Sequence, residues 1–372
     1  MLSLAIVTTN ERVSIVSRLS MIIISNQSSV SKSSMLQRSY CLIFLLLITT
    51  GCTSPYHEHF WRENVELTTP KSVVSGEVFV SDGKVESLPN KHSQSDLISR
   101  INRAEDRVWI EIYTWTDAAK LTDTIVWAKK RWLDVRVVLE GNVFGTPKIN
   151  LPIVKKLKEA GISVVYADNH RYSFTHAKFW IIDDTYSIST GNWTASFFTK
   201  NREYIYTAMD SVTLRFLEEI FTADSSHMGY KDISLVPSHI VMSPINARSR
   251  LEQLILSPEK SILFYVQTLD DEYILWLIAS LVSAGKKVEI CTADNESNRA
   301  RQAEFPSWHW RVIKKPYIHA KVIIVDNSQV FIGSHNLTTN AIENNREMGI
   351  ILDHRDDIVE QIQSDFTRDG CR

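Results

Sequence analysis

The sequence predicts an α/β fold built from two related lobes, each with a mixed sheet flanked by helices. The first observation behind this prediction is a repeat, because the tripeptide His176-Ala177-Lys178 returns 143 residues later as His319-Ala320-Lys321. The second is that helix-like and strand-like segments alternate in the same order before each copy. The spacing leaves enough chain for one α/β unit per copy. One site made from two halves, in a cleft between the lobes, is therefore expected.

The segments before each tripeptide match in order and type: a helix, an apolar strand, a second helix and a second strand. The expected helices are 96–104, 118–131, 248–256 and 273–284, and the expected strands are 108–113, 135–139, 261–266 and 287–291. The first half adds a helix at 151–160 and a strand at 162–166. Gly161 follows that helix and suits its C-terminus, since glycine readily adopts the left-handed conformation found there.

Each tripeptide opens a buried strand. Residues 179–182 and 322–325 are apolar runs that end in a polar turn. Side chains two apart on a strand share a face, so the His and Lys of one copy point the same way and the small Ala points to the other side. Two more strands are expected after each of these, at 186–189 and 204–208 in the first half and at 329–332 and 348–352 in the second.

A matching set of polar residues follows each tripeptide. The first set is Asp183, Asn192, Thr194 and Asn201-Arg202-Glu203, and the second is Asp326, Asn336, Thr338 and Asn345-Arg346-Glu347. His to Asp is seven residues in both copies and Asn to Glu is eleven in both, whereas His to Asn is sixteen in the first and seventeen in the second. The strand that each Glu opens would bring its carboxylate towards a His ring.

These residue types suit phosphodiester chemistry without a metal or cofactor. A neutral imidazole is a nucleophile or base, and an imidazolium is an acid. Lys and Asn donate hydrogen bonds to an oxyanion such as the non-bridging oxygens of a phosphate. A Glu bonded to the far ring nitrogen would select the tautomer of its His. A metal site made from the two His and two Glu is the weaker alternative, because two lysines aimed at the same point would repel a cation.

The pattern His-x-Lys-x4-Asp followed by Gly-Ser-x-Asn resembles the signature of the phospholipase D superfamily, and its duplication resembles the two-motif members. The second copy is complete through Gly333-Ser334-His335-Asn336. The first has Ser189-Thr190-Gly191-Asn192 instead and is one residue shorter between Asp and Asn. The resemblance covers residues 76 to 355 and implies a two-lobed fold with one shared active site. It also implies cleavage or transfer of a phosphodiester through a phosphohistidine.

The resemblance also implies roles for particular residues. His176 would be the nucleophile and His319 the general acid and then base, while Glu203 and Glu347 would orient the two rings. Asp183 and Asp326 would brace the turn after each strand. The complete candidate set comprises His176, Lys178, Asp183, Asn192, Glu203, His319, Lys321, Asp326, Ser334, Asn336 and Glu347.

The N-terminal region resembles a bacterial lipoprotein signal. Arg38 precedes a short apolar run that ends at Gly51-Cys52, and the run is too short for a membrane span. Cys52 is the expected lipid-attachment residue, which would place the protein in the bacterial cell envelope, or outside the cell if it is not lipidated. The expected divisions are leader and signal 1–51, tether 52–75, first lobe 76–226, linker 227–247 and second lobe 248–372.

Charge and cysteine content narrow the function. The chain has a formal charge of -2, and residues 1–51 carry four basic residues and one acidic, so the remainder is near -5. A nuclease usually carries a basic surface, so a phospholipid substrate is favoured and a secreted nuclease of the same superfamily is the alternative. A binding protein on the same fold is the third hypothesis, and a monomer is expected. Cys291 and Cys371 are interpreted as a buried thiol and a free one.

Other residues near the motifs have two interpretations. The aromatic residues that flank the motifs would either line a substrate groove or pack in the core. They are Phe174, Trp193, Phe197, Phe198, Phe305, Trp308 and Trp310. His335, in the variable position of the second motif, is expected at the solvent surface.

Overall fold

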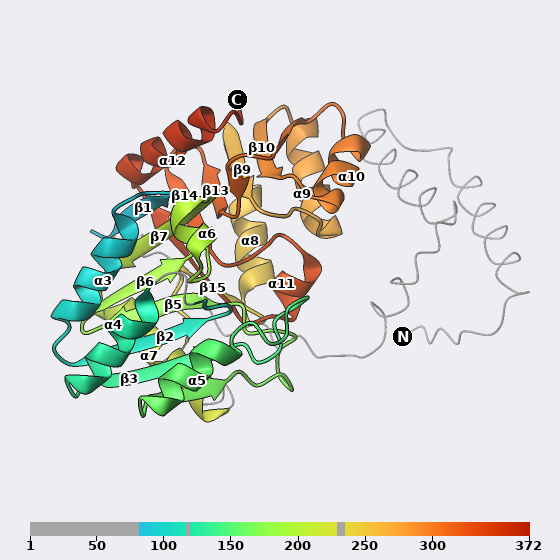
Figure 1. Cartoon of the computed structure of the whole chain (residues 1–372). Helices are drawn as coiled ribbons and strands as arrows, with labels where there is room; N and C mark the ends of the chain where they lie inside the picture. Colours follow the sequence, from blue (N-terminus) through green and yellow to red (C-terminus); the bar gives the residue numbers. More distant parts are fainter. Residues whose placement is uncertain (1–81, 117–119, 229–234) are drawn as a thin grey trace, which may run out of the picture. The chain divides into compact units, whose positions relative to one another are not determined.

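The structure is a computed structural model that describes residues 82–116, 120–228 and 235–372. The expectations for the leader, the signal, Cys52, the tether and the first six residues of the first lobe fall outside these residues. Two mixed sheets with flanking helices form the fold, as the sequence predicts (Figure 1). None of the helices in the described ranges is long and apolar enough to cross a membrane.

The first sheet has the strand order β1-β7-β6-β5-β2-β3-β4. Its strands are β1 (Lys84–Leu88), β2 (Arg107–Ile112), β3 (Asp134–Leu139), β4 (Ser163–Tyr166), β5 (Lys178–Ile182), β6 (Thr185–Ser189) and β7 (Asn201–Ala208). Strands β2, β3 and β4 are parallel, and the remaining neighbours are antiparallel. The associated helices are α3 (Ser93–Arg103), α4 (Leu121–Lys130), α5 (Leu151–Glu159), α6 (Ala195–Thr199) and α7 (Ser211–Ser226).

The second sheet has the order β11-β10-β9-β13-β14-β15-β8 and repeats the same directions. Its strands are β8 (Ile240–Ser243), β9 (Ser261–Val266), β10 (Lys287–Ala293), β11 (His309–Ile313), β13 (Lys321–Val325), β14 (Gln329–Gly333) and β15 (Glu347–Asp353). Its helices are α8 (Ala247–Leu256), α9 (Glu272–Ser283), α10 (Glu296–Glu304), α11 (Thr339–Glu343) and α12 (Asp356–Arg368). Strand β8 lies inside the expected linker yet pairs with β15 in this sheet.

Three apolar clusters hold the sheets and helices together. One cluster packs α3, α4 and α5 on the first sheet, and a second packs α8 and α9 on the second sheet. The third contains residues of both sheets together with α7 and α12. It includes Ala177 and Ala320, so the small middle residue of each tripeptide faces the core that the lobes share. Burying this continuous apolar surface removes it from water, which favours one rigid arrangement of the lobes.

The lobes also exchange strands at the tripeptides. The two-residue strand β12 (Tyr317–Ile318), which precedes the second tripeptide, pairs with β7 of the first sheet. Thr175, which precedes the first tripeptide, forms an isolated bridge to Arg346 beside β15. Each lobe therefore contributes the chain just before its His to the other lobe.

The interpretation of the two late cysteines as free thiols is wrong. Cys291 in β10 and Cys371 after α12 form a disulfide with a Cα–Cα distance of 5.5 Å. The chain beyond α12 returns to β10, where the Arg372 side chain also binds the Glu289 carboxylate at 3.0 Å. A sequence separation of 80 residues gave no indication that these two positions meet.

Candidate active site

Backbone pairing between the lobes places the two catalytic-type histidines. The backbone N–H of His176 donates to the carbonyl of Arg346 at 2.8 Å, and that of His319 donates to the carbonyl of Arg202 at 3.1 Å. Each of those arginines directly precedes the Glu of its own copy. As a result, each His is held beside the Glu of the other lobe.

The two histidines therefore form crossed pairs with the two glutamates. The Nδ1 atom of His176 lies 2.9 and 2.8 Å from the carboxylate oxygens of Glu347. The Nδ1 atom of His319 lies 2.8 Å from Oε1 of Glu203. A carboxylate at Nδ1 holds the ring proton there and leaves Nε2 as the reactive nitrogen. The His side chains are 12% and 13% exposed, so both remain accessible from solvent.

Burial and neighbouring charges set the protonation of these pairs. Desolvation lowers the pKa of His176 to about 4 against the opposing effect of Glu347, and it lowers the pKa of His319 against that of Glu203. Burial alone would raise the pKa of Glu347, but His176 and Lys178 bring it to about 2. Both lowered pKa values favour a neutral ring beside an ionised carboxylate, the state required of a nucleophile or base, and a ring must gain a proton before it can act as an acid.

The two motif lysines lie buried between the pairs. Nζ of Lys178 donates to the carbonyl of His176 at 2.6 Å, and Nζ of Lys321 donates to the carbonyl of His319 at 2.6 Å. Desolvation lowers the pKa of Lys178, and it brings that of Lys321 to about 8. Lys178 is electrostatically coupled to Lys321 and to both glutamates, so the two halves form one site. In its protonated form, a lysine in this position attracts an anion such as a phosphodiester.

The irregular first motif reproduces the contacts of the regular second motif. The hydroxyl of Thr190 donates to Glu203 at 2.7 Å, and that of Ser334 donates to Glu347 at 2.6 Å. Each hydroxyl also accepts the backbone N–H that follows its Glu, at 2.9 and 3.0 Å. A Cβ on Gly191 would lie 2.4 Å from the Glu203 carboxylate, so this position of the first motif requires glycine. The hydroxyl function is therefore intact in both halves.

The one-residue difference between the copies lies away from the chemistry. The turn between β5 and β6 has two residues, because Ile182 pairs with Thr185. The turn between β13 and β14 has three, because Val325 pairs with Gln329. From the start of the second strand to the motif Asn, the copies have equal length. The shorter spacing in the first copy thus reflects its hairpin turn and leaves the motif unchanged.

The motif aspartates do not join the His pairs. Asp183 follows β5 at the end away from His176, and its carboxylate accepts the N–H groups of residues 105, 106 and 107 at 3.0, 2.9 and 3.1 Å. Asp326 likewise accepts from residues 259, 260 and 261 at 2.5, 2.8 and 2.7 Å. Both have positive φ, 50° and 48°. Each Asp ties the end of its motif strand to the start of the neighbouring strand.

The motif asparagines differ in their partners. Oδ1 of Asn192 accepts the N–H of Thr114 at 3.2 Å, which orients its amide. Oδ1 of Asn336 is buried and has no protein partner in the described residues. The asparagine that begins each Asn-Arg-Glu run instead donates a hydrogen bond to the glutamate of the same run. Nδ2 of Asn201 donates to Glu203 at 3.2 Å, and Nδ2 of Asn345 donates to Glu347 at 3.0 Å.

His335 is fully buried, which corrects the expectation that it lies at the solvent surface. Its ring packs edge-on against Phe331 at 5.6 Å, and within the described part of the chain neither ring nitrogen has a hydrogen-bond partner. Desolvation lowers the pKa of His335 to about 4, although Glu347 opposes this effect. The corresponding first-motif position is Gly191, so this third His breaks the symmetry of the site.

The arginine of each Asn-Arg-Glu run forms an ion pair with an acidic side chain outside the repeated motif. Arg346 binds the carboxylate of Asp224 with two hydrogen bonds of 2.8 Å, and Arg202 binds Asp369 at 2.6 and 2.9 Å. Neither arginine was among the residues that the sequence predicted for the site. The repeated Asn-Arg-Glu triplet indicated that both arginines matter, but their acidic partners Asp224 and Asp369 do not belong to the repeated pattern.

Most of the motif-flanking aromatics pack in the core. Trp193, Phe197, Phe198 and Trp310 are buried. Phe305 and Trp308 pack on the second-lobe cluster. Phe174 alone of this group reaches the active site, through Tyr113, whose ring centroid lies 4.7 Å from that of His176. Tyr113 was not among the sequence candidates.

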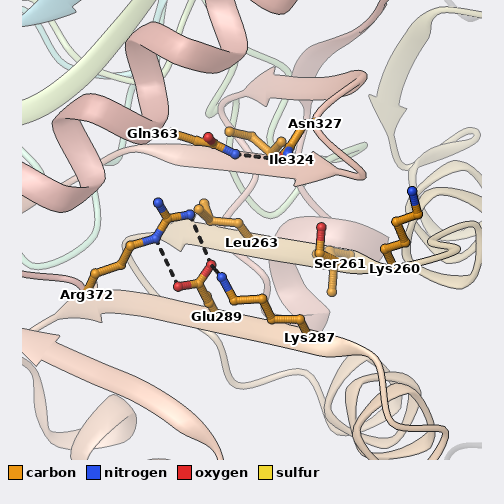
Figure 2. A pocket seen from close by; sticks show the side chains of 10 residues that line it. Lys260, Ser261, Leu263, Lys287, Glu289, Ile324, Asn327, Gln363 and Arg372 are labelled. Atoms are coloured by element: carbon orange, nitrogen blue, oxygen red, sulfur yellow. Dashed lines mark hydrogen bonds and ion pairs between the residues drawn. The ribbon is translucent and has the colours of Figure 1, made fainter.

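A separate cavity of about 370 Å³ lies in the second lobe, near the turn that contains Asn327 (Figure 2). The Glu289 carboxylate binds Lys287 at 3.0 Å and Arg372 at 3.0 and 3.1 Å, and Gln363 donates to Asn327 at 2.6 Å. None of the candidate catalytic residues lines this cavity. Among the described residues, no group of three or more His, Cys, Asp or Glu side chains is placed to hold a metal ion.

Comparison with solved structures supports the fold. Phosphatidylserine synthase from Haemophilus influenzae Rd KW20 superposes with a TM-score of 0.61 at 14% identity, covering 75% of this chain and 84% of that one. Polyphosphate kinase from Porphyromonas gingivalis gives 0.57 at 14% identity, covering 76% of this chain. The aligned region spans about half of the kinase, 49%. Nuc from Salmonella typhimurium, a phospholipase D family member, gives 0.36 at 22% identity over 39% of this chain and 93% of that one.

None of the curated proteins matches this sequence. The model of one protein family does, over residues 97–225 and 251–370, which include both tripeptides and both Asn-Arg-Glu runs. That family is described as cardiolipin synthase, PLD-like domain. Since the match covers more than half of the chain and both halves of the site, this protein belongs to the PLD-like cardiolipin synthase domain family of the phospholipase D superfamily.

Proposed function

We propose that the protein cleaves phospholipid phosphodiester bonds through a phosphohistidine, with hydrolysis or headgroup transfer as the outcome. The family supports phosphodiester cleavage or transfer as the class of reaction. The observation that carries the proposal is the crossed arrangement of His176–Glu347 and His319–Glu203, which places each carboxylate at Nδ1 and keeps it away from Nε2, beside two buried lysines. Such a pair supplies a nucleophile and an acid to one phosphorus.

In the proposed reaction, Nε2 of His176 attacks phosphorus and the bond to the first alcohol breaks. The imidazolium of His319 gives its proton to the departing oxygen. Water or a second alcohol then attacks the phosphorus, His319 removes its proton, and the phosphorus–nitrogen bond breaks. Lys178 and Lys321 stabilise the charge on the non-bridging oxygens throughout. Glu347 and Glu203 stabilise the positive charge that each ring carries in turn.

A phospholipid substrate and an envelope location support each other. The N-terminal pattern predicts lipid attachment at Cys52, and the chain after it is acidic and so lacks the charge typical of a nuclease. The Cys291–Cys371 disulfide adds support for an oxidising compartment, because disulfides persist mainly outside the cytosol. We also propose that the protein functions as a monomer.

The binding-protein alternative loses its sequence support. That alternative depended on the irregular Ser189-Thr190-Gly191-Asn192 segment. Thr190 makes the same contact to its Glu as Ser334 makes in the regular motif. The nuclease alternative is decided by the substrate assay below.

The test is a product assay of the full chain in mixed micelles with a chelator present. Labelled phosphatidylcholine, phosphatidylethanolamine, phosphatidylglycerol and single-stranded DNA are offered side by side. His319→Ala serves as the inactive variant, and Lys155→Ala, which changes an exposed lysine on α5, serves as the matched control. Lipid turnover lost only in His319→Ala would support the proposal. Cleavage of DNA alone would replace it with the nuclease.

A second substrate assigns the two histidines. A phosphatidyl ester of p-nitrophenol has a leaving group that needs no proton, so its release in the first turnover depends on the nucleophile and not on the acid. His319→Ala should still release p-nitrophenol in the first turnover and should accumulate protein in which His176 carries the labelled phosphatidyl group. His176→Ala should lose it. The reverse result would exchange the two roles.

A further inference from the structure

The residues around the two histidines differ although the lobes are related by a repeat. Tyr113 follows β2 directly, and Gln267 holds the same position after β9. Phe174 lies two residues before His176, and Tyr317 lies two before His319. Two aromatic rings in one lobe therefore correspond to an amide and a phenol in the other.

The side of the site next to His176 is apolar. The Tyr113 ring meets that His edge-on at 4.7 Å and meets Phe174 at 6.0 Å, and Phe174 in turn meets Phe144 at 6.3 Å. The N–H of Phe144 donates to the Tyr113 hydroxyl at 2.8 Å, which fixes the loop in place. Phe144 is 80% exposed. A row of rings thus leads from the His176 ring to the surface and offers an apolar wall.

The side of the site next to His319 is polar, and one of its hydrogen-bond acceptors has no partner among the described residues. Nε2 of Gln267 donates to the Tyr317 hydroxyl at 3.1 Å, and the Tyr317 ring lies 6.3 Å from that of His319. Oε1 of Gln267 is buried without a protein partner in the described residues. A buried carbonyl oxygen left unpaired is costly, so a ligand that donates a hydrogen bond fits there. The Tyr317 hydroxyl keeps its own hydrogen to donate.

We propose that Gln267 and Tyr317 form a subsite for the polar alcohol that leaves or attacks at His319, while the acyl-bearing part of the lipid lies along the Tyr113–Phe174–Phe144 wall. This inference rests on the proposed function. One acceptor and one donor complement a hydroxyl group, and neither residue is charged. A neutral polyol headgroup of the glycerol type therefore fits better than a quaternary ammonium group.

The assignment agrees with the order of the reaction. The departing oxygen must lie where His319 can protonate it, which places its remaining hydroxyls beside Gln267. The phosphatidyl group stays bonded to His176, which places its chains beside the aromatic wall. Attack by an acceptor alcohol retraces departure in reverse, so the same subsite would select acceptors.

The test compares two substrates that differ only in the hydroxyls of the headgroup, phosphatidylglycerol and phosphatidylpropanol. The full chain should favour phosphatidylglycerol in kcat/KM for headgroup release. Gln267→Leu and the milder Tyr317→Phe should each lower this preference about tenfold, because each removes one hydrogen bond. Tyr317 is 37% exposed, so its variant tests the subsite even if Gln267→Leu does not fold. Phe144→Ala should leave the preference unchanged and lower turnover of long-chain relative to short-chain lipid.

The outcomes separate the two levels of the argument. Lipid turnover with an unchanged headgroup preference in Tyr317→Phe would overturn the subsite and leave the proposed function intact. A complete lack of lipid turnover by the unmodified protein would overturn the proposed function and the subsite together.

Discussion

The crossed His–Glu pairs predict that each glutamate controls the histidine of the other lobe. Glu347→Gln and Glu203→Gln remove a charge and keep a neutral acceptor of nearly the same shape. Both carboxylates are almost fully buried and lie 2.8 Å from their Nδ1 atoms, so solvent screening is small. A charge-assisted hydrogen bond contributes about 1 to 1.5 kcal/mol more than a neutral one. Each variant should therefore slow the step that its His performs about tenfold.

The two variants are distinguished by the p-nitrophenol ester. Glu347→Gln impairs the nucleophile, so it should slow first-turnover release of both p-nitrophenol and a natural headgroup. Glu203→Gln impairs the acid, so it should slow natural headgroup release and spare p-nitrophenol. The alanine variants of the two histidines assign their roles independently. If Glu203→Gln then acted through His176 and Glu347→Gln through His319, the pairing across lobes would be refuted.

The other predictions concern pH and stability. The pH profile of kcat/KM should be bell-shaped. Activity should fall on the acid side near pH 4, where the His176 nucleophile becomes protonated, and on the alkaline side below pH 6.5, where His319 loses the proton that it donates. A fall on the alkaline side that begins only above pH 6.5 would contradict this prediction. Cys371→Ser should lower the free energy of unfolding by about 4 kcal/mol in urea titrations, since the disulfide closes a loop across 80 residues, and a reductant should weaken only the unmodified protein. His335 has a folded pKa near 4 and an ordinary value of 6.5, so the unfolded chain binds its proton first and stability falls as pH drops between these values. In His335→Gln, the free energy of unfolding should fall by about 3 kcal/mol less on acidification than in the unmodified protein. An equal fall in both proteins would argue against a buried neutral ring at His335.

Local pattern was sufficient for much of the secondary structure. The expected strand 261–266 is β9 to the residue, and the expected strand 135–139 begins one residue inside β3. Short apolar runs of about four to six residues that are rich in β-branched side chains and bounded by polar turns favour buried strands, so their assignment depends little on distant residues. Short segments such as β12 and the edge strands β1 and β8 escaped notice, because their pairing partners alone make them strands.

Local sequence patterns also identified the candidate site residues, but they did not show which of these residues contact one another. A duplicated His, Lys, Asn and Glu at matching distances indicates one site from two halves, because independent structural needs would not repeat the full set. The same spacing appears whether each Glu serves its own His or that of the other lobe. The crossing follows from the pairing of β12 with β7 and from the bridge between Thr175 and Arg346.

The sequence by itself determined the α/β class, the two-fold repeat, the succession of helices and strands before each tripeptide and the identity of the residues able to act on a phosphodiester. Only the tertiary structure decided which Glu faces which His, that Cys371 returns to Cys291, and that His335 is buried. It also revealed the different surroundings of the two histidines at Tyr113 and Gln267. The physical reason is that periodicity and spacing record contacts along one strand or helix. The protonation of the site instead depends on burial and charge contributed across the core that the two lobes share.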